Sequence, residues 1–190
     1  MLRLKVPELE HSKSILTKYD YDEFNVVFCI LRAKFPQDQN SHFEILKRKY
    51  FKLFDFKTLQ FPLSLKDIGK FLQNNKWLDI TIKIILYHNG KCYPQQFFGN
   101  GGKIVHLIYV RYLEKNDCQY KTSNHYFLMK NPDAFLSNLY RGGKNRKKLY
   151  FCLNCLCKFP SEKDKDKHEK ECSLKNRSQR VVMPKSKNNE

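Results

Sequence analysis

Three cysteines and one histidine near the C-terminus have the types and spacing of a metal site: Cys152, Cys155, His168 and Cys172, in the pattern C-x2-C-x12-H-x3-C. Two cysteines on a tight turn, followed by two ligands one helical turn apart, can form a tetrahedron around Zn²⁺. Because His168 and Cys172 are four positions apart, a helix would present both on one face. The sequence therefore predicts one zinc ion, bound by this Cys-Cys-His-Cys set.

The alternative is that these four side chains are unrelated, or that the cysteines form disulfides. The chain has seven cysteines, an odd number that does not suit a disulfide framework. No signal peptide is recognisable at the N-terminus. Both features favour a reduced, intracellular compartment and a metal site.

The elements that must position these ligands are two short strands and a helix. Phe159 lies where small ββα fingers place a core aromatic residue, whereas Lys165 lies where they bury a leucine. We therefore expect a ββα-type zinc finger over residues 151–173 with a thin core. Cys157 is expected to be a spare thiol that faces outward.

The N-terminal part of the chain predicts helices. The run FNVVFCILRAKF, residues 24–35, is apolar almost all round, which is typical of a buried helix. A second helix should follow a cap at Asn40 or Ser41. A third should cover residues 65–72, with Ser64 at its start.

The pattern changes to strands in the middle of the chain. Apolar and alternating segments predict strands over 79–87, 91–98, 103–112 and 124–130. His88-Asn89-Gly90 should form a hairpin turn, and Pro94 should confine its strand to an edge. A short helix is expected over 133–139. This order predicts an α+β domain in which N-terminal helices precede a small, mainly antiparallel sheet.

The positive charge of the chain is concentrated near its C-terminus. The net charge is +17, and residues 141–190 contribute +9 of it. Such an excess predicts a polyanionic partner, usually nucleic acid, with an acidic membrane surface as the competing alternative. The expected organisation is a leader at 1–20, the α+β domain at 21–140, a basic hinge at 141–150, the finger at 151–173 and a basic flexible tail at 174–190. The candidate phosphate contacts are Arg141, Lys144, Arg146, Lys147, Lys148, Lys167, Lys175, Arg177 and Arg180.

The finger helix is poorly suited to reading a base sequence. Residues 161–171 contain four lysines and five acidic residues. Of the positions that would face bases (Ser161, Asp164 and Lys167), only Lys167 suits a guanine edge. We therefore expect contacts to backbone phosphates without sequence readout. No segment has the roughly 20 apolar residues needed to span a bilayer. Nucleic acid is therefore preferred to a membrane as the expected partner.

A second candidate site involves a thiol and an imidazole. His125 opens an apolar strand and could be a catalytic imidazole, with Cys29 as the nucleophile. However, Cys29 lies in an apolar run, where a free cysteine usually belongs to the core. The glycine-rich segment FGNGGK, residues 98–103, lacks the spacing of a phosphate-binding loop. It is predicted to be a hairpin turn.

Four segments of the chain resemble a known family: FPLSLKDIGKF, NHYFLMKN, YFCLNCLCKF…KHEKEC and QRVVMP. They are similar to the region ahead of the exonuclease domain in protein-primed family B DNA polymerases of Polinton/Maverick and adintovirus-like elements. The resemblance covers most of residues 24–184. The exonuclease and polymerase core would begin beyond Glu190, so the resemblance implies a non-catalytic module associated with DNA. It also implies a nuclear location and, as a possible partner, a polymerase encoded elsewhere.

The N-terminal region of that family is similar to papain-like, OTU-type cysteine proteases. The resemblance implies a catalytic cysteine at the start of the first buried helix and a histidine in the later strand, which His125 matches. It places Asn25, not Cys29, at the nucleophile's position, so it implies that the protease chemistry is lost. Two alternative functions stay open: a peptidase that uses Cys29 and His125, and a protein-interaction module.

Overall fold

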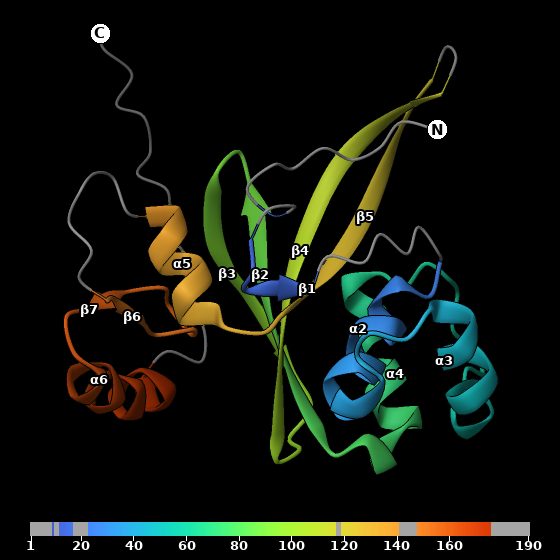
Figure 1. Cartoon of the computed structure of the whole chain (residues 1–190), viewed down its shortest axis with the longest axis horizontal. Coiled ribbons are helices and arrows are strands. Elements are labelled where there is room, and N and C mark those ends of the chain that lie inside the picture. Colours follow the sequence, from blue (N-terminus) through green and yellow to red (C-terminus); the bar gives the residue numbers. More distant parts are fainter. Residues whose placement is uncertain (1–8, 10–11, 17–22, 117–118, 141–147, 176–190) are drawn as a thin grey trace, which may run out of the picture.

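The structure is a computed structural model of the 190-residue chain, and it describes residues 9, 12–16, 23–116, 119–140 and 148–175 (Figure 1). Its main body is a mixed five-stranded sheet with the strand order β1-β5-β4-β2-β3. The strands are β1 (Ile15–Leu16), β2 (Ile80–His88), β3 (Lys91–Phe98), β4 (Lys103–Asn116) and β5 (Gln119–Met129). Among the described pairings of this sheet, β2–β4 is parallel and the others are antiparallel. The predicted α+β class with a mainly antiparallel sheet is therefore confirmed.

Helices cover the two faces of this sheet. The longer helices of the body are α2 (Asn25–Lys34), α3 (Phe43–Tyr50), α4 (Leu65–Asn74) and α5 (Pro132–Tyr140). Two 3-10 turns, η1 (Pro36–Asp38) and η2 (Phe51–Leu53), lie between these helices, and a third, η3 (Lys76–Leu78), lies between α4 and β2. Helices α2, α3 and α4 lie on one side of the sheet, and α5 lies on the other together with the C-terminal finger (Figure 1). No described helix is both long and apolar enough to cross a membrane.

The sheet separates two hydrophobic cores, because neighbouring residues of a strand face opposite sides. The first core lies under α2, α3 and α4 and includes Phe28, Leu46, Phe71, Ile82, Ile84 and Leu107. The second core lies under α5 and includes Ile85, Ile108, Phe127, Phe135, Leu136 and Phe151. Ile84 and Ile85 of β2 thus belong to different cores.

The observed starts of the helices agree in part with those predicted from the sequence. Residues 25–32 of α2 are all buried, as expected for a helix that is apolar on every side. Ser64 is the residue before α4, as predicted. The predicted cap of α3 is wrong. His42, rather than Asn40 or Ser41, precedes this helix, and its Nδ1 accepts a hydrogen bond from the Glu44 backbone N–H at 3.5 Å.

The link between β3 and β4 differs from the prediction. Residues 99–102 were expected to form a hairpin turn, but β2 lies between the two strands that they join. The link therefore crosses the start of β2 and spans two strand spacings, roughly 10 Å, which four residues can reach. It passes so close that a Cβ on Gly101 would lie 2.1 Å from the carbonyl carbon of Asp79. Only glycine fits that position.

The outer strand β3 confirms two predictions. The β2–β3 turn has positive φ angles at Asn89 (48°) and Gly90 (74°), as a tight hairpin requires. Pro94 lies on an edge strand, next to a shift in the pairing register between Ile84 and Ile85. Tyr140 at the end of α5 covers part of this edge. Its hydroxyl accepts from the Cys92 N–H at 2.9 Å and contacts the Cys92 carbonyl at 3.2 Å.

Candidate metal centre

The four predicted ligands meet in one place. One ligand atom each from Cys152, Cys155, His168 and Cys172 lies within 4.8 Å of all the others. Cys155 Sγ lies 3.2 Å from His168 Nε2. A tetrahedral ion with metal–sulfur bonds of about 2.3 Å would hold sulfurs about 3.8 Å apart. The cluster can therefore hold one metal ion after side-chain adjustments of an ångström or less.

A small ββα unit builds this cluster, as the spacing predicted. It consists of β6 (Tyr150–Phe151), β7 (Lys158–Phe159) and α6 (Glu162–Lys175), with β6 and β7 antiparallel. The first two ligands lie on the turn between the strands. Within it, the Leu156 N–H donates to the Cys152 carbonyl at 2.7 Å, and the Cys152 N–H donates to the Cys157 carbonyl at 3.0 Å. Leu156 completes the turn in the left-handed conformation, at a φ of 61°.

The cluster is shielded from solvent, which affects the protonation of its thiols. Cys152 and Cys172 are buried, and Cys155 and His168 are partly exposed. Burial raises the pKa of the Cys152 and Cys155 thiols. Without a cation these thiols keep their protons at neutral pH, so metal binding must release protons. Metal affinity should therefore fall as the pH is lowered.

The finger has little core of its own. The Phe159 ring packs against the His168 ring, with centroids 4.8 Å apart, but Phe159 is only partly buried. The Lys165 side chain is only 16% exposed, so its aliphatic stem fills the position at which other ββα fingers bury a leucine. Cys157 is exposed, as predicted, and is not part of the cluster.

The finger also packs against the main body. Phe151 of β6 is 2% exposed and belongs to the second core. Asp133 Oδ1 of α5 accepts from the Phe151 N–H at 2.9 Å, and Ser137 Oγ donates to the Leu149 carbonyl at 2.9 Å. The contacts of Asp133 and Ser137 could not be predicted from the sequence, because nothing in the local pattern says which element a helical side chain will contact.

The predicted phosphate contacts are only partly within the described structure. Lys148 is exposed, with its Nζ 4.6 Å from the Tyr150 ring centroid, and Lys167 is exposed on α6. Lys175 is the last residue of α6. The remaining candidates lie outside the described residues: Arg141, Lys144, Arg146, Lys147, Arg177 and Arg180.

The candidate thiol–imidazole site has an amide beside its imidazole. Asn25, the first residue of α2, places Nδ2 3.3 Å from His125 Nε2, and its Oδ1 accepts from the Tyr126 N–H at 2.7 Å. Cys29, one turn later, contacts the Tyr126 carbonyl with its Sγ at 3.5 Å. Burial lowers the pKa of His125 to about 4. Asn25 offers no nucleophile, and so weak a base is poorly suited to activating a thiol.

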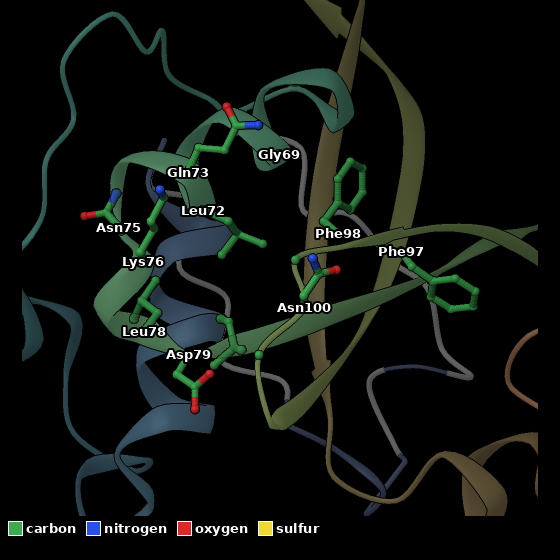
Figure 2. A pocket seen from close by; sticks show the side chains of 13 residues that line it. Gly69, Leu72, Gln73, Asn75, Lys76, Leu78, Asp79, Phe97, Phe98 and Asn100 are labelled. Carbon is green, nitrogen blue, oxygen red and sulfur yellow. The ribbon is translucent and has the colours of Figure 1, made fainter.

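The glycine-rich link borders an open pocket of about 510 Å³. Figure 2 shows Leu72, Phe98 and Lys76 among the side chains around it. The Gly101 N–H donates to the Ile80 carbonyl at 3.3 Å, and the Gly102 N–H donates to an Asp79 carboxylate oxygen at 3.3 Å. Because these two donors already have partners and an anion lies beside them, the link is not built to hold a phosphate.

The chain matches no protein-family model, and comparison with curated proteins and with solved structures finds no similar protein. The candidate function therefore depends on the chemistry of the site and on the charge of the chain.

Proposed function

We propose that this protein is a zinc-stabilised nucleic-acid-binding module without catalytic activity. In this proposal the Cys-Cys-His-Cys centre holds the finger together, and the basic segments on either side of it contact backbone phosphates. The observation that carries the proposal is the cluster of four ligand atoms within 4.8 Å, located between two strongly basic stretches of the sequence.

The donor set supports zinc as the ion. Three thiolates and one imidazole in a closed, shielded site are the usual ligands of structural Zn²⁺. The cluster lies on a ββα unit in which the β6–β7 turn carries Cys152 and Cys155, and α6 carries His168 and Cys172. When bound, zinc would supply a tetrahedral crosslink between the β6–β7 turn and α6, and it would leave no open position for a reacting water.

The charge distribution supports a polyanion as the partner. The finger helix itself is close to neutral over residues 161–171, whereas residues 141–148 carry five basic residues and no acidic ones. A neutral metal unit with basic flanks suits contacts to phosphates rather than to base edges. We therefore propose DNA binding that is weak, indifferent to sequence and strongly dependent on salt.

The sequence resemblance to the Polinton/Maverick and adintovirus-like polymerases supports DNA over other polyanions. In this proposal the chain derives from the region that precedes the exonuclease domain of such a polymerase. Action in the nucleus and a polymerase partner are further parts of the same proposal.

A salt titration tests the DNA-binding proposal. Fluorescence anisotropy with a labelled 30-base-pair duplex should give a linear fall of log affinity with log salt. Replacing the five basic residues of 141–148 by glutamine should remove up to five phosphate contacts and make the slope shallower by as much as about 4.5. The matched control replaces five exposed lysines of the main body: Lys52, Lys57, Lys66, Lys70 and Lys91.

The two variants remove the same charge and therefore separate a localised interface from a general attraction. The proposal expects the control to keep most of the wild-type slope. Equal losses in both variants, or no binding at low salt, would contradict it.

A further inference from the structure

Four phenylalanine rings surround the ammonium group of Lys47. Its Nζ lies 5.2 Å from the ring centroid of Phe24, 5.9 Å from Phe28, 5.4 Å from Phe43 and 6.0 Å from Phe51. All four distances are within the range in which a cation is attracted by the face of an aromatic ring. We call these four rings the aromatic cage.

The cage has a buried floor and a partly open rim. Phe28 is fully buried in the first core, whereas Phe24, Phe43 and Phe51 are partly exposed. The rings also support each other, with centroids 5.0 Å apart for Phe24 and Phe51 and 5.6 Å apart for Phe28 and Phe51. The cage is therefore preformed by core packing, and three of its four rings are partly exposed to solvent.

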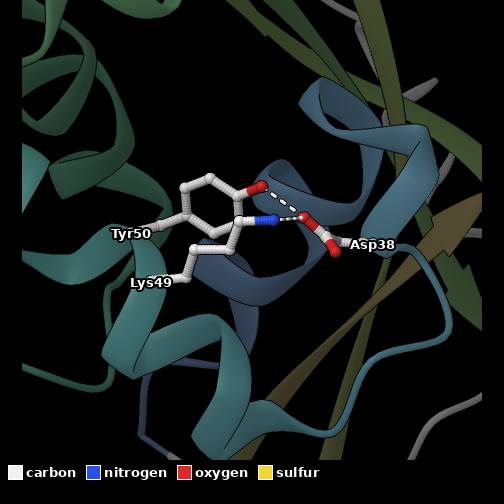
Figure 3. A network of polar contacts seen from close by, with 3 residues as sticks. All are labelled: Asp38, Lys49 and Tyr50. Atoms are coloured by element: carbon white, nitrogen blue, oxygen red, sulfur yellow. Dashed lines mark hydrogen bonds and ion pairs between the residues drawn. The ribbon is translucent and has the colours of Figure 1, made fainter.

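A second contact fixes the helix that carries Lys47. Figure 3 shows Asp38, after α2, receiving both Lys49 and Tyr50 from the end of α3. Lys49 Nζ lies 2.6 Å from Asp38 Oδ2, and the Tyr50 hydroxyl donates to the same oxygen. The Tyr50 ring also stacks on Phe35, with centroids 4.1 Å apart. These contacts set the position of α3, and with it the position of Lys47 over the rings.

Rings arranged around a cation in this way are suited to N-methylated ammonium groups. An unmodified lysine ammonium is strongly hydrated and loses hydrogen bonds to water when it enters such a site. Trimethylation keeps the charge and replaces the N–H donors by apolar methyl groups, which pack against the rings. Four aromatic faces around one position therefore match a methylated ammonium.

We propose that the aromatic cage is a binding site for a trimethylated lysine of a partner protein, and that Lys47 occupies and closes it. The Lys47 ammonium stands in for the cationic group of the ligand. Because Lys47 is tethered, it competes at an effective concentration of roughly millimolar or more. Displacement or neutralisation of Lys47 would open the site.

The test removes the internal occupant. Lys47→Ala and Lys47→Gln are titrated with an uncharged peptide carrying one trimethyllysine, with the unmodified peptide and with tetramethylammonium, and the Phe signals are followed by NMR. Both variants should bind the trimethylated peptide about tenfold or more tightly than the wild type does. Lys52→Ala, which removes an exposed lysine outside the cage, should behave as the wild type.

Two further variants identify the rings as the site. In the Lys47→Gln background, Phe43→Leu and Phe51→Leu should abolish binding of the trimethylated peptide, because leucine keeps apolar bulk but has no aromatic face. Unchanged binding in these variants, or no binding in folded Lys47→Ala and Lys47→Gln, would overturn the proposal. Phosphocholine is titrated in parallel, and tighter binding of phosphocholine than of the trimethylated peptide would overturn the choice of a protein partner.

Discussion

Metal removal should loosen α5 as well as the finger, because Phe151 connects the two. The finger's own core consists of little more than the Phe159–His168 contact, so without its ion the finger should unfold. Phe151 would then leave the second core, and the hydrogen bonds to Asp133 and Ser137 would be lost. The second core should thus lose part of its cover.

The magnitude follows from these contacts. Losing a buried phenylalanine side chain destabilises a core by about 3–5 kcal/mol, and each hydrogen bond contributes about 1 kcal/mol. The free energy for local opening of α5 should therefore fall by about 5 kcal/mol. Since about 1.4 kcal/mol corresponds to a tenfold change in an equilibrium constant, its amide exchange should accelerate by about a thousandfold or more, up to the limit set by the stability of the helix.

Hydrogen exchange measured by mass spectrometry, with and without a chelator, checks this expectation. Peptides covering α5 should lose protection when the metal is removed. The same peptides should also be less protected in the His168→Ala variant. Peptides covering α2 should change least, because α2 packs in the first core on the opposite face of the sheet. Cys157→Ser removes an exposed thiol outside the ligand set and should match the wild type. Full protection of α5 in the metal-free protein would refute the coupling.

Three further outcomes follow from the main body. The stability of the fold should be retained above pH 6.5 and lost as the pH falls towards 4, because His125 takes up a proton in the unfolded chain but not while it is buried; the lowered pKa of His125 corresponds to about 3 kcal/mol. In urea titrations at several pH values, His125→Gln should flatten this pH dependence. An unchanged dependence would contradict the role of His125. Asn25→Ala should lower the free energy of unfolding by about 1–3 kcal/mol, because the buried Tyr126 N–H loses its acceptor; an unchanged denaturation midpoint would argue against that bond. Gly101→Ala should destabilise the fold more than Gly90→Ala. A Cβ at position 90 would have open space around it and would only have to accommodate a positive φ, whereas a Cβ at position 101 would clash with Asp79. Equal shifts in the melting temperature would be inconsistent with the close crossing of β2.

The parts of the fold that could be predicted are those set by local sequence. The Asn89-Gly90 turn and Pro94 define β3, and the observed strand has the predicted bounds. The candidate metal cluster was also predictable, because Cys152 and Cys155, like His168 and Cys172, are close in sequence and lie on local elements. The paired strands β4 and β5 extend beyond the predicted ranges 103–112 and 124–130, and they pair up to Asn116 and Gln119. The sequence did not predict this extension, because the segment after Tyr112 is polar and lacks a strand pattern.

The parts that could not be predicted depend on contacts between distant residues. The sequence of the β3–β4 link predicts a hairpin turn, because nothing in it indicates that β2 lies between the two strands. Asn25 looks like an ordinary helix residue, and its contact with His125 joins positions 100 residues apart. The aromatic cage likewise combines side chains from the start of α2, from α3 and from η2, so no local motif marks it.

The metal content of the purified chain tests the central claim most directly. Native mass spectrometry of protein purified without chelator should show one zinc per chain for the wild type and for Cys157→Ser, and none for His168→Ala or Cys172→Ser. Substitution by Co²⁺ should give the visible absorption of a tetrahedral thiolate site. A wild-type chain that takes up no metal, with its ligand cysteines joined in disulfides instead, would contradict the account.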